Sequence, residues 1–322
     1  MVNLSDSCIE IISQDDFNGW LEAHKLGIGA SQIAAVLGEH LFASRLRVWA
    51  EKVGRLEPAD LSDVEAVNWG LLLEPLVAQE YARKTGRTLQ KGGVLLQSTA
   101  YPWAIATPDY WIEYTADMSI PIQIKTTSAF RLNDWADGPP IEVWWQVQHE
   151  MFVTGAPWAS VGVLVGGNRF MWADVERDEA AIERIRTEGA AFWEQVKNNT
   201  YPDPDSNASD VIAELFQSAA EGEELALPHE AIEWDSALSD LKEDRKRLED
   251  EIQLLENKIK LSIGPAEKGA LVDGSGAYTY KNQSRWTVKL AEGEPKPTNP
   301  EGELVKGFAT RSDFRVLRRS GA

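Results

Sequence analysis

The sequence A-I-A-T-P-D-Y at 104–110 is followed, after a short interval, by I-Q-I-K-T-T at 122–127. The first stretch places Asp109 at the end of an apolar run, and the second alternates as a strand does. Because side chains in a strand alternate with period two, Gln123 and Lys125 share one face. An acid on one strand beside a polar-x-Lys pair on its neighbour is typical of metal-dependent phosphodiesterases. There the carboxylate holds a hard cation, and the lysine steadies the water or the developing charge.

Each half of this pattern also has an ordinary interpretation. A Pro-Asp pair is most often a turn, in which Pro fixes φ and Asp bonds its own backbone. A lone I-x-I-K is most often an edge strand with a solvated lysine. The short spacing between the two halves favours a site, and the flanking segments strengthen that interpretation.

Length and composition fit a two-domain intracellular protein. The chain has 322 residues, which allows a nuclease-sized core and an appendage. Its N-terminus lacks the basic region followed by an apolar region that forms a secretory signal. No apolar run approaches the length of a membrane span. The one cysteine, Cys8, cannot form an internal disulfide. We therefore expect a cytoplasmic location. The net charge of −19 argues against loose coating of DNA, but contact with DNA depends on local basic patches.

The order of predicted elements indicates an α/β fold, with a mixed sheet flanked by helices. Apolar spacing predicts helices at 64–85, 143–153 and 179–198, and strands at 88–97, 104–107, 111–114, 121–126, 159–165 and 169–175. We expect a catalytic core at 1–200, an acidic linker at 201–230, a heptad helix at 231–263 and a small basic β-rich tail at 264–322. The heptad spacing fits either a coiled coil with a partner or a helix packed on its own domain.

Two segments upstream of Asp109 could contribute to a site. G-I-G-A-S-Q-I-A-A-V-L-G at 27–38 reads as a glycine-loosened loop, a serine N-cap and a short apolar helix. Free N–H groups at such a helix start can receive a phosphate, although a plain capped turn has the same sequence. Glu74 lies among apolar neighbours in the helix at 64–85, where it is either solvated or turned into a site.

Six blocks in order resemble one known family over about residues 17–180. They are the segment at 27–38, N-W-G-L-L-L-E-P-L at 68–76, A-T-P-D at 106–109, Q-I-K-T-T at 123–127, Q-V-Q-H at 146–149 and L-V-G-G-N at 164–168. The chain resembles the YqaJ-type viral recombinase nucleases, relatives of phage lambda exonuclease within the PD-(D/E)XK superfamily. That resemblance implies a PD-(D/E)XK core, restriction-endonuclease-like, as the fold.

The resemblance also implies a site for Mg²⁺, or for Mn²⁺. Asp109 would be its principal ligand, position 123 the second acidic ligand, and the Ile124 carbonyl would complete the shell. Glu74 would orient or join the metal shell.

Further roles follow from the same resemblance. Lys125 would activate or position the water, and Gln146 would help to organise the catalytic site. The implied contacts to DNA and its 5′-phosphate are Ser31, Lys25, His24, Thr107 and Arg131.

The most important departure from the family pattern is Gln123, where the family has a glutamate. An amide keeps the shape but loses the charge, and Mg²⁺ prefers carboxylate oxygen. The amide is either compensated by Glu74 or Glu113, or it marks an inactive form, natural or made by replacing a glutamate. A second departure is Glu150, where relatives often carry an aromatic residue.

The resemblance implies a metal-dependent 5′–3′ exonuclease on linear double-stranded DNA that leaves 3′ single-strand tails for phage-type recombination. It implies a phage or prophage protein of a bacterial host, a single-strand annealing protein as partner, and a homo-oligomer such as a trimeric ring, with no membrane association. Two alternatives remain open at this point. One is an endonuclease on branched or nicked DNA, and the other is a catalytically silent scaffold that binds DNA ends.

Overall fold

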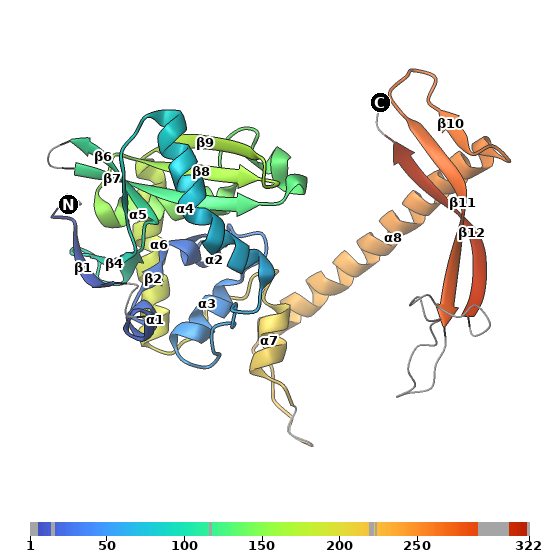
Figure 1. Ribbon diagram of the computed structural model, residues 1–322. Helices are drawn as coiled ribbons and strands as arrows, with labels where there is room; N and C mark the ends of the chain where they lie inside the picture. The colour runs from blue at the N-terminus through green and yellow to red at the C-terminus, as the bar shows by residue number, and fades with distance from the viewer. Residues whose placement is uncertain are drawn as a thin grey trace. The chain divides into compact units, whose positions relative to one another are not determined.

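The chain forms two compact units, Met1–Glu221 and Gly222–Ala322, in a computed structural model (Figure 1). The structure describes residues 6–13, 17–115, 118–218, 222, 224–288 and 309–320. Within these ranges, no helix combines the length and the apolar character that crossing a bilayer requires.

A five-stranded mixed sheet lies at the centre of the first unit. Its order is β3-β6-β7-β8-β9, in which β7 and β8 run parallel and all other neighbours are antiparallel. The strands are β3 (Leu89–Lys91), β6 (Tyr110–Thr115), β7 (Met118–Thr127), β8 (Trp158–Val165) and β9 (Arg169–Glu176). The predicted mixed sheet is confirmed.

Helices cover the two faces of this sheet. Helix α4 (Glu65–Thr85) crosses it along β7, β8 and β9 (Figure 1). On that side Gly162 leaves room where a Cβ would lie 3.3 Å from both Ile124 and Tyr81. Helix α5 (Ile141–Thr154) packs on the other side, against β7 and β8, with Met151 in the core. The alternation of β7 therefore directs Ile122 and Ile124 to α4, and Gln123 and Lys125 to α5.

A second, smaller sheet has the order β1-β4-β5-β2. Its strands are β1 (Cys8–Ser13), β2 (Ile28–Gly29), β4 (Val94–Ser98) and β5 (Ala104–Ala106). Only β2 and β5 are parallel, with Ile28 opposite Ala104 and Gly29 opposite Ile105. The helices around this sheet and the rest of the first unit are α1 (Phe17–Lys25), η1 (Ala30–Gln32), α2 (Ile33–Val36), α3 (Arg45–Lys52), η2 (Ala129–Trp135), α6 (Glu179–Lys197) and α7 (Ser209–Leu215).

The segment predicted as one strand, 88–97, divides between the two sheets. Gly92 and Gly93 interrupt it, and Gly93 has a φ of +87°. A Cβ at Gly92 would lie 2.1 Å from the Pro108 carbonyl oxygen, whereas the Gly92 N–H donates to Asp109 O at 2.8 Å. The glycines thus let this turn pack directly on the backbone that carries Asp109.

The first unit extends beyond residue 200, into the segment expected to be a linker. Asp205 Oδ2 accepts hydrogen bonds from the Arg45 N–H at 2.7 Å and the Ser44 hydroxyl at 3.1 Å. Ala208 and Val211 are buried in the core of this unit. These contacts hold α7 against the core, which the polar composition of the segment does not reveal.

The second unit consists of one long helix and a three-stranded antiparallel sheet. Helix α8 (Ala231–Ile263) has the predicted bounds, and the sheet has the order β10 (Lys268–Ala270), β11 (Ala277–Val288), β12 (Ala309–Ser320). Arg315 lies over the Tyr280 ring at 3.8 Å and donates to the Gly264 carbonyl at 2.7 Å. Heptad side chains such as Leu241 and Ile252 are exposed on α8.

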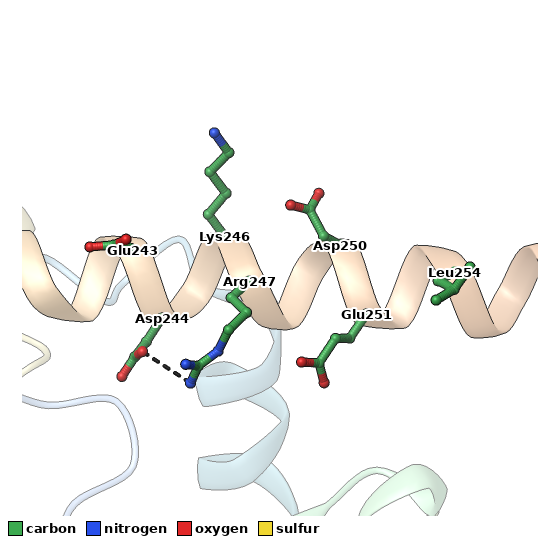
Figure 2. A pocket seen from close by; sticks show the side chains of 7 residues that line it. All are labelled: Glu243, Asp244, Lys246, Arg247, Asp250, Glu251 and Leu254. Atoms are coloured by element: carbon green, nitrogen blue, oxygen red, sulfur yellow. Dashed lines mark ion pairs between the residues drawn. The ribbon is translucent and has the colours of Figure 1, made fainter.

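The middle of α8 is charged, as Figure 2 shows. The side chains there project from a single helix, and Arg247 forms an ion pair with Asp244 at 3.1 Å. The hollow along this face is lined by Glu243, Asp244, Lys246, Arg247, Asp250, Glu251 and Leu254. Mixed charges at helical spacing are typical of a solvated helix face.

Packing of α6 on Trp103 should make Gly189 intolerant of a side chain. A Cβ at Gly189 would lie 2.5 Å from the Trp103 ring. Overpacking of this kind costs about 1–3 kcal/mol and outweighs the gain of up to about 1 kcal/mol in helix propensity. We expect Gly189→Ala to lower the free energy of unfolding in urea by roughly 1–2 kcal/mol.

The matched control is Gly70→Ala in α4. There a Cβ meets only Thr126 Oγ1 at 3.5 Å, an ordinary contact. This variant should be as stable as the parent or more stable, since only the propensity gain remains. Equal stability changes in the two variants would contradict the assigned packing.

Candidate active site

Asp109 lies at the junction of β5 and β6 and is bound to the neighbouring strand. Its Oδ2 atom accepts a hydrogen bond of 2.7 Å from the Ile124 N–H of β7. Burial raises the pKa of Asp109, whereas the Lys125 ammonium and that N–H act in the opposite direction. The carboxylate is therefore fixed in position, and Lys125 is the cation that acts on it.

Strand β7 brings Gln123 and Lys125 to the same face, as the alternation predicts. Lys125 Nζ donates to Gln123 Oε1 at 3.2 Å. Gln123 is 2% exposed, and its Nε2 donates to the Thr107 carbonyl at 3.4 Å. The structure thus brings together Asp109, Gln123 and Lys125, the three residues that the strand pattern singled out.

Glu74 joins this group from α4. The carboxylate is half-buried, and its pKa is raised first by burial and then by repulsion from Asp109. Lys91 and Lys125 oppose that rise. Glu74 thus lies partly buried and within electrostatic range of Asp109. Glu113, the other acid considered as compensation for Gln123, is exposed and accepts a hydrogen bond from Gln90 at 2.7 Å.

Helix α5 adds Gln146 and Glu150 to the site. Gln146 Nε2 donates to Glu150 Oε1 at 3.3 Å. Glu150 is fully buried, and the pKa of its carboxyl is raised to about 8, by burial and then by the Asp109 carboxylate. This pKa is lowered in turn by the Lys125 ammonium and by hydrogen bonds from Gln146 and Gln123.

Glu150 departs from the family pattern, and no role in the site was predicted for it. One signal was available, since Glu150 follows Gln146 by four residues and must share its helix face.

The atoms around Asp109 that could bind a metal ion are all oxygens. In the described part of the chain, no group of three or more His, Cys, Asp and Glu side chains is arranged to hold a metal ion. Any cation here must therefore combine carboxylates with neutral oxygens, namely the Gln123 amide and the Ile124 carbonyl. Hard cations such as Mg²⁺ accept such mixed sets and keep several waters.

The predicted phosphate contacts divide into separate groups. Thr107 directly precedes the Pro108-Asp109 pair, and its hydroxyl is buried with no partner within the described ranges. Ser31 is exposed in η1, just after β2. Because β2 runs parallel to β5 in register, Ser31 and Thr107 leave their strands in the same direction. The pairing thus places Ser31 at the same end of the sheet as Asp109.

His24 and Lys25 lie before β2, along a separate groove. Both line it together with Glu22, Gln32, Lys52 and Leu71. Lys25 is exposed and forms an ion pair with Glu22 at 2.9 Å. The pKa of His24 is lowered to about 4, by burial and then by the Lys52 ammonium, so the ring is uncharged at neutral pH.

Arg131, in η2, is held by two carboxylates. It forms ion pairs with Asp134 at 2.8 Å and with Glu142 at 2.9 Å. A phosphate would have to compete with both acids for this guanidinium.

The shift of His24 gives a pH dependence of stability. Its pKa is about 4 in the folded chain and 6.5 ordinarily, so stability is fully present above pH 6.5 and is lost as the pH falls toward 4. We expect His24→Gln to make the decline in melting temperature between pH 6.5 and 4.5 shallower, with little change at pH 7.5.

Thermal melts of both proteins across that range provide the measurement. The same substitution at exposed His229 controls for the loss of a histidine as such. Parallel curves for the parent and His24→Gln would show that His24 is not buried in its neutral form.

Residues 19–157, which include all the side chains around Asp109, match the model of the YqaJ-like viral recombinase domain. The chain is also similar to the uncharacterized protein YqaJ of Bacillus subtilis (strain 168). The two are 30% identical over 256 residues, which cover 78% of this chain and 79% of that protein.

Solved structures similar to this chain include two exonucleases. The alkaline exonuclease LHK-Exo from Laribacter hongkongensis aligns with a TM-score of 0.47 and 23% identity, over 56% of this chain and 93% of that one. A phage related exonuclease from Haemophilus somnus 129PT aligns with a TM-score of 0.41 and 12% identity, over 56% of this chain and 97% of that one.

Proposed function

Since the chain belongs to the YqaJ-like viral recombinase family, we propose that it is a metal-dependent nuclease that degrades linear duplex DNA from its 5′ ends. The observation that carries this proposal is the convergence of Asp109, Gln123 and Lys125 from two adjacent strands. A fixed carboxylate beside a lysine suits hydrolysis of a phosphodiester, in which negative charge must be both positioned and offset.

The residues around Asp109 fit a hard divalent cation such as Mg²⁺ or Mn²⁺. Asp109 would bind it through the carboxylate, with the Ile124 carbonyl and the Gln123 amide oxygen as further donors, and Glu74 would orient the metal shell. The orphaned hydroxyl of Thr107 and the repulsion between Asp109 and Glu74 both suit a place where a cation balances the charge. When bound, such a cation lowers the pKa of its water and neutralises charge on the phosphate.

The chain's own groups position the reactants. Lys125 Nζ, held at 3.2 Å from Gln123 Oε1, is directed into the site and can orient the attacking water or offset charge on a nonbridging oxygen. The hydrogen bond from the Ile124 N–H engages Oδ2 of Asp109, so Oδ1 can receive a ligand or a proton. On the α5 side of the site, Gln146 donates a hydrogen bond to the Glu150 carboxyl group and so orients it.

A DNA end would be recognised next to the cleavage site. The parallel pairing of β2 and β5 supports a 5′-phosphate site near Ser31 and Thr107, because hydroxyl groups can donate to phosphate oxygens. Lys25 and His24 line the adjoining groove, where His24 would contribute as a neutral donor. Digestion from the 5′ end leaves a 3′ single strand, the substrate of an annealing protein, which we propose as the partner.

A closed homotrimeric ring would reconcile the acidic chain with its substrate. With a net charge of −19, repulsion from DNA must be overcome locally, and a ring confines the contact to its channel. One observation favours a second function: the amide at Gln123 lowers the anionic charge of the site, as in a silent DNA-end-binding scaffold.

Asp109→Asn tests the assignment directly. Because Asp109 anchors the cation, we expect Mg²⁺-dependent digestion of 5′-phosphorylated linear duplex to fall by roughly a thousandfold, which corresponds to a loss of several kcal/mol. Asp210→Asn, at an exposed acid of α7, is the matched control and should keep full activity. Release of nucleotides is measured on linear, nicked and closed circular DNA.

The alternatives give different results in the same assay. Digestion confined to linear DNA supports the exonuclease, and cutting of circular DNA would point to an endonuclease. If the parent chain binds ends without digesting them, the scaffold function replaces the nuclease. An Asp109→Asn variant with full activity would remove Asp109 from the site.

Ser31→Ala tests the recognition of the 5′ end. Loss of one hydrogen bond to a charged phosphate corresponds to about 1.5–3 kcal/mol, so the rate ratio between 5′-phosphorylated and 5′-hydroxyl duplex should fall by at least about tenfold. Ser218→Ala, at another exposed serine, is the control. An unchanged ratio in Ser31→Ala would place the phosphate elsewhere.

A further inference from the structure

Glu150 is a buried acid that lacks a full set of partners. It is 0% exposed in the interior of α5. Its Oε1 accepts from the neutral Gln146 amide at 3.3 Å, and the neutral Gln123 amide also faces the carboxyl group, but Oε2 has no hydrogen-bond partner in the described part of the chain. A carboxylate buried in this way is costly unless a positive charge faces it.

The surroundings of Glu150 are those of the candidate site. Gln123 and Lys125 project from β7 toward α5, and both act on the Glu150 carboxylate. The Asp109 carboxylate also lies close enough to repel it. Two acids, two amides and one ammonium group therefore meet between β7 and α5.

Lys125 does not neutralise both acids. Its Nζ donates to Gln123 Oε1, an uncharged acceptor, rather than to Glu150. The same ammonium group also stabilises the negative charge of Asp109. When both acids are ionised, one ammonium group cannot balance their charge, whereas a divalent cation can.

We propose that Glu150, supplied by helix α5, is the second carboxylate ligand of the divalent cation, together with Asp109. Gln123 then offers only a neutral oxygen and an N–H, and the charge that β7 lacks comes from the helix facing it. This inference rests on the metal site of the proposed function and assigns one of its ligands.

Other acids near the site suit this role less well. Glu113 is exposed and bonded to Gln90. Glu74 is only half-buried, and the positive charges of Lys91 and Lys125 already offset the repulsion between Glu74 and Asp109. Glu150 combines full burial, an oxygen atom with no hydrogen-bond partner in the described ranges, and proximity to the residues of β7.

Calorimetric titration of the full chain with Mn²⁺, without DNA, tests the assignment independently of catalysis. Loss of a carboxylate ligand lowers the affinity for a hard cation, so Glu150→Gln should weaken Mn²⁺ binding by at least about tenfold. Glu113→Gln is the matched control and should bind as the parent does.

Metal-free melting separates a ligand from a structural acid. Replacing this buried, incompletely hydrogen-bonded acid by an amide of the same shape should keep or raise the melting temperature of Glu150→Gln. The rise that saturating Mn²⁺ produces in the parent should shrink in this variant, because that rise follows from affinity. An acid with a purely structural role would instead lower the metal-free melting temperature and leave Mn²⁺ affinity unchanged.

The exchanged variant Gln123→Glu with Glu150→Gln provides a second test. It keeps one acid and one amide in the same volume, so it should fold even if Glu150→Gln alone does not. We expect Mn²⁺ affinity within about threefold of the parent, since the carboxylate returns from β7 to the same cation. Failure of this folded variant to bind Mn²⁺ would overturn the inference, as would parent-like binding by Glu150→Gln or no binding by the parent.

Failure of the inference and failure of the proposed function give different results. If Glu150 holds Mn²⁺ but no form of DNA is digested, the metal site stands and the nuclease does not. If DNA is digested with Mn²⁺ while Glu150→Gln binds and cleaves normally, the nuclease stands and the ligand assignment fails.

Discussion

The hydrogen bond from the Ile124 N–H to Asp109 Oδ2, 2.7 Å long, joins the two parts of the candidate site. It fastens the turn after β5 to the middle of β7, so that the acid and the polar face of β7 keep a fixed relation. Gly92 permits this arrangement, because a side chain there would strike the Pro108 carbonyl. The remaining groups of the site lie around this junction, from α4 on one side and α5 on the other.

The layer between β7 and α5 contains an unusual concentration of buried polar groups. Gln123, Gln146 and Glu150 are all nearly or fully inaccessible, beside the apolar side chains of Val147 and Met151. Such a layer weakens folding unless every group is satisfied. Because Glu150 Oε2 has no hydrogen-bond partner in the described residues, this layer costs stability.

Local patterns account for what the sequence could predict, and tertiary packing accounts for what it could not. Alternation alone placed Gln123 and Lys125 together, and the Pro-Asp pair located Asp109. Every residue from Trp145 to Thr154 is buried, so α5 has no polar face to mark Glu150 as functional. The neutrality of His24 depends on burial against Lys52, and the anchoring of α7 depends on Asp205; neither can be read from nearby sequence.

The short parallel pairing of β2 with β5 has a geometric consequence. On the proposed function, Ser31 marks where a DNA strand ends and Asp109 marks where it is cut, and backbone hydrogen bonds between two strands set the separation. That separation would fix the length of the released fragment, and it depends on the backbone rather than on side chains. Substitutions around the site would then change the rate of cleavage, whereas the fragment length would change only if the pairing of the two strands shifted in register.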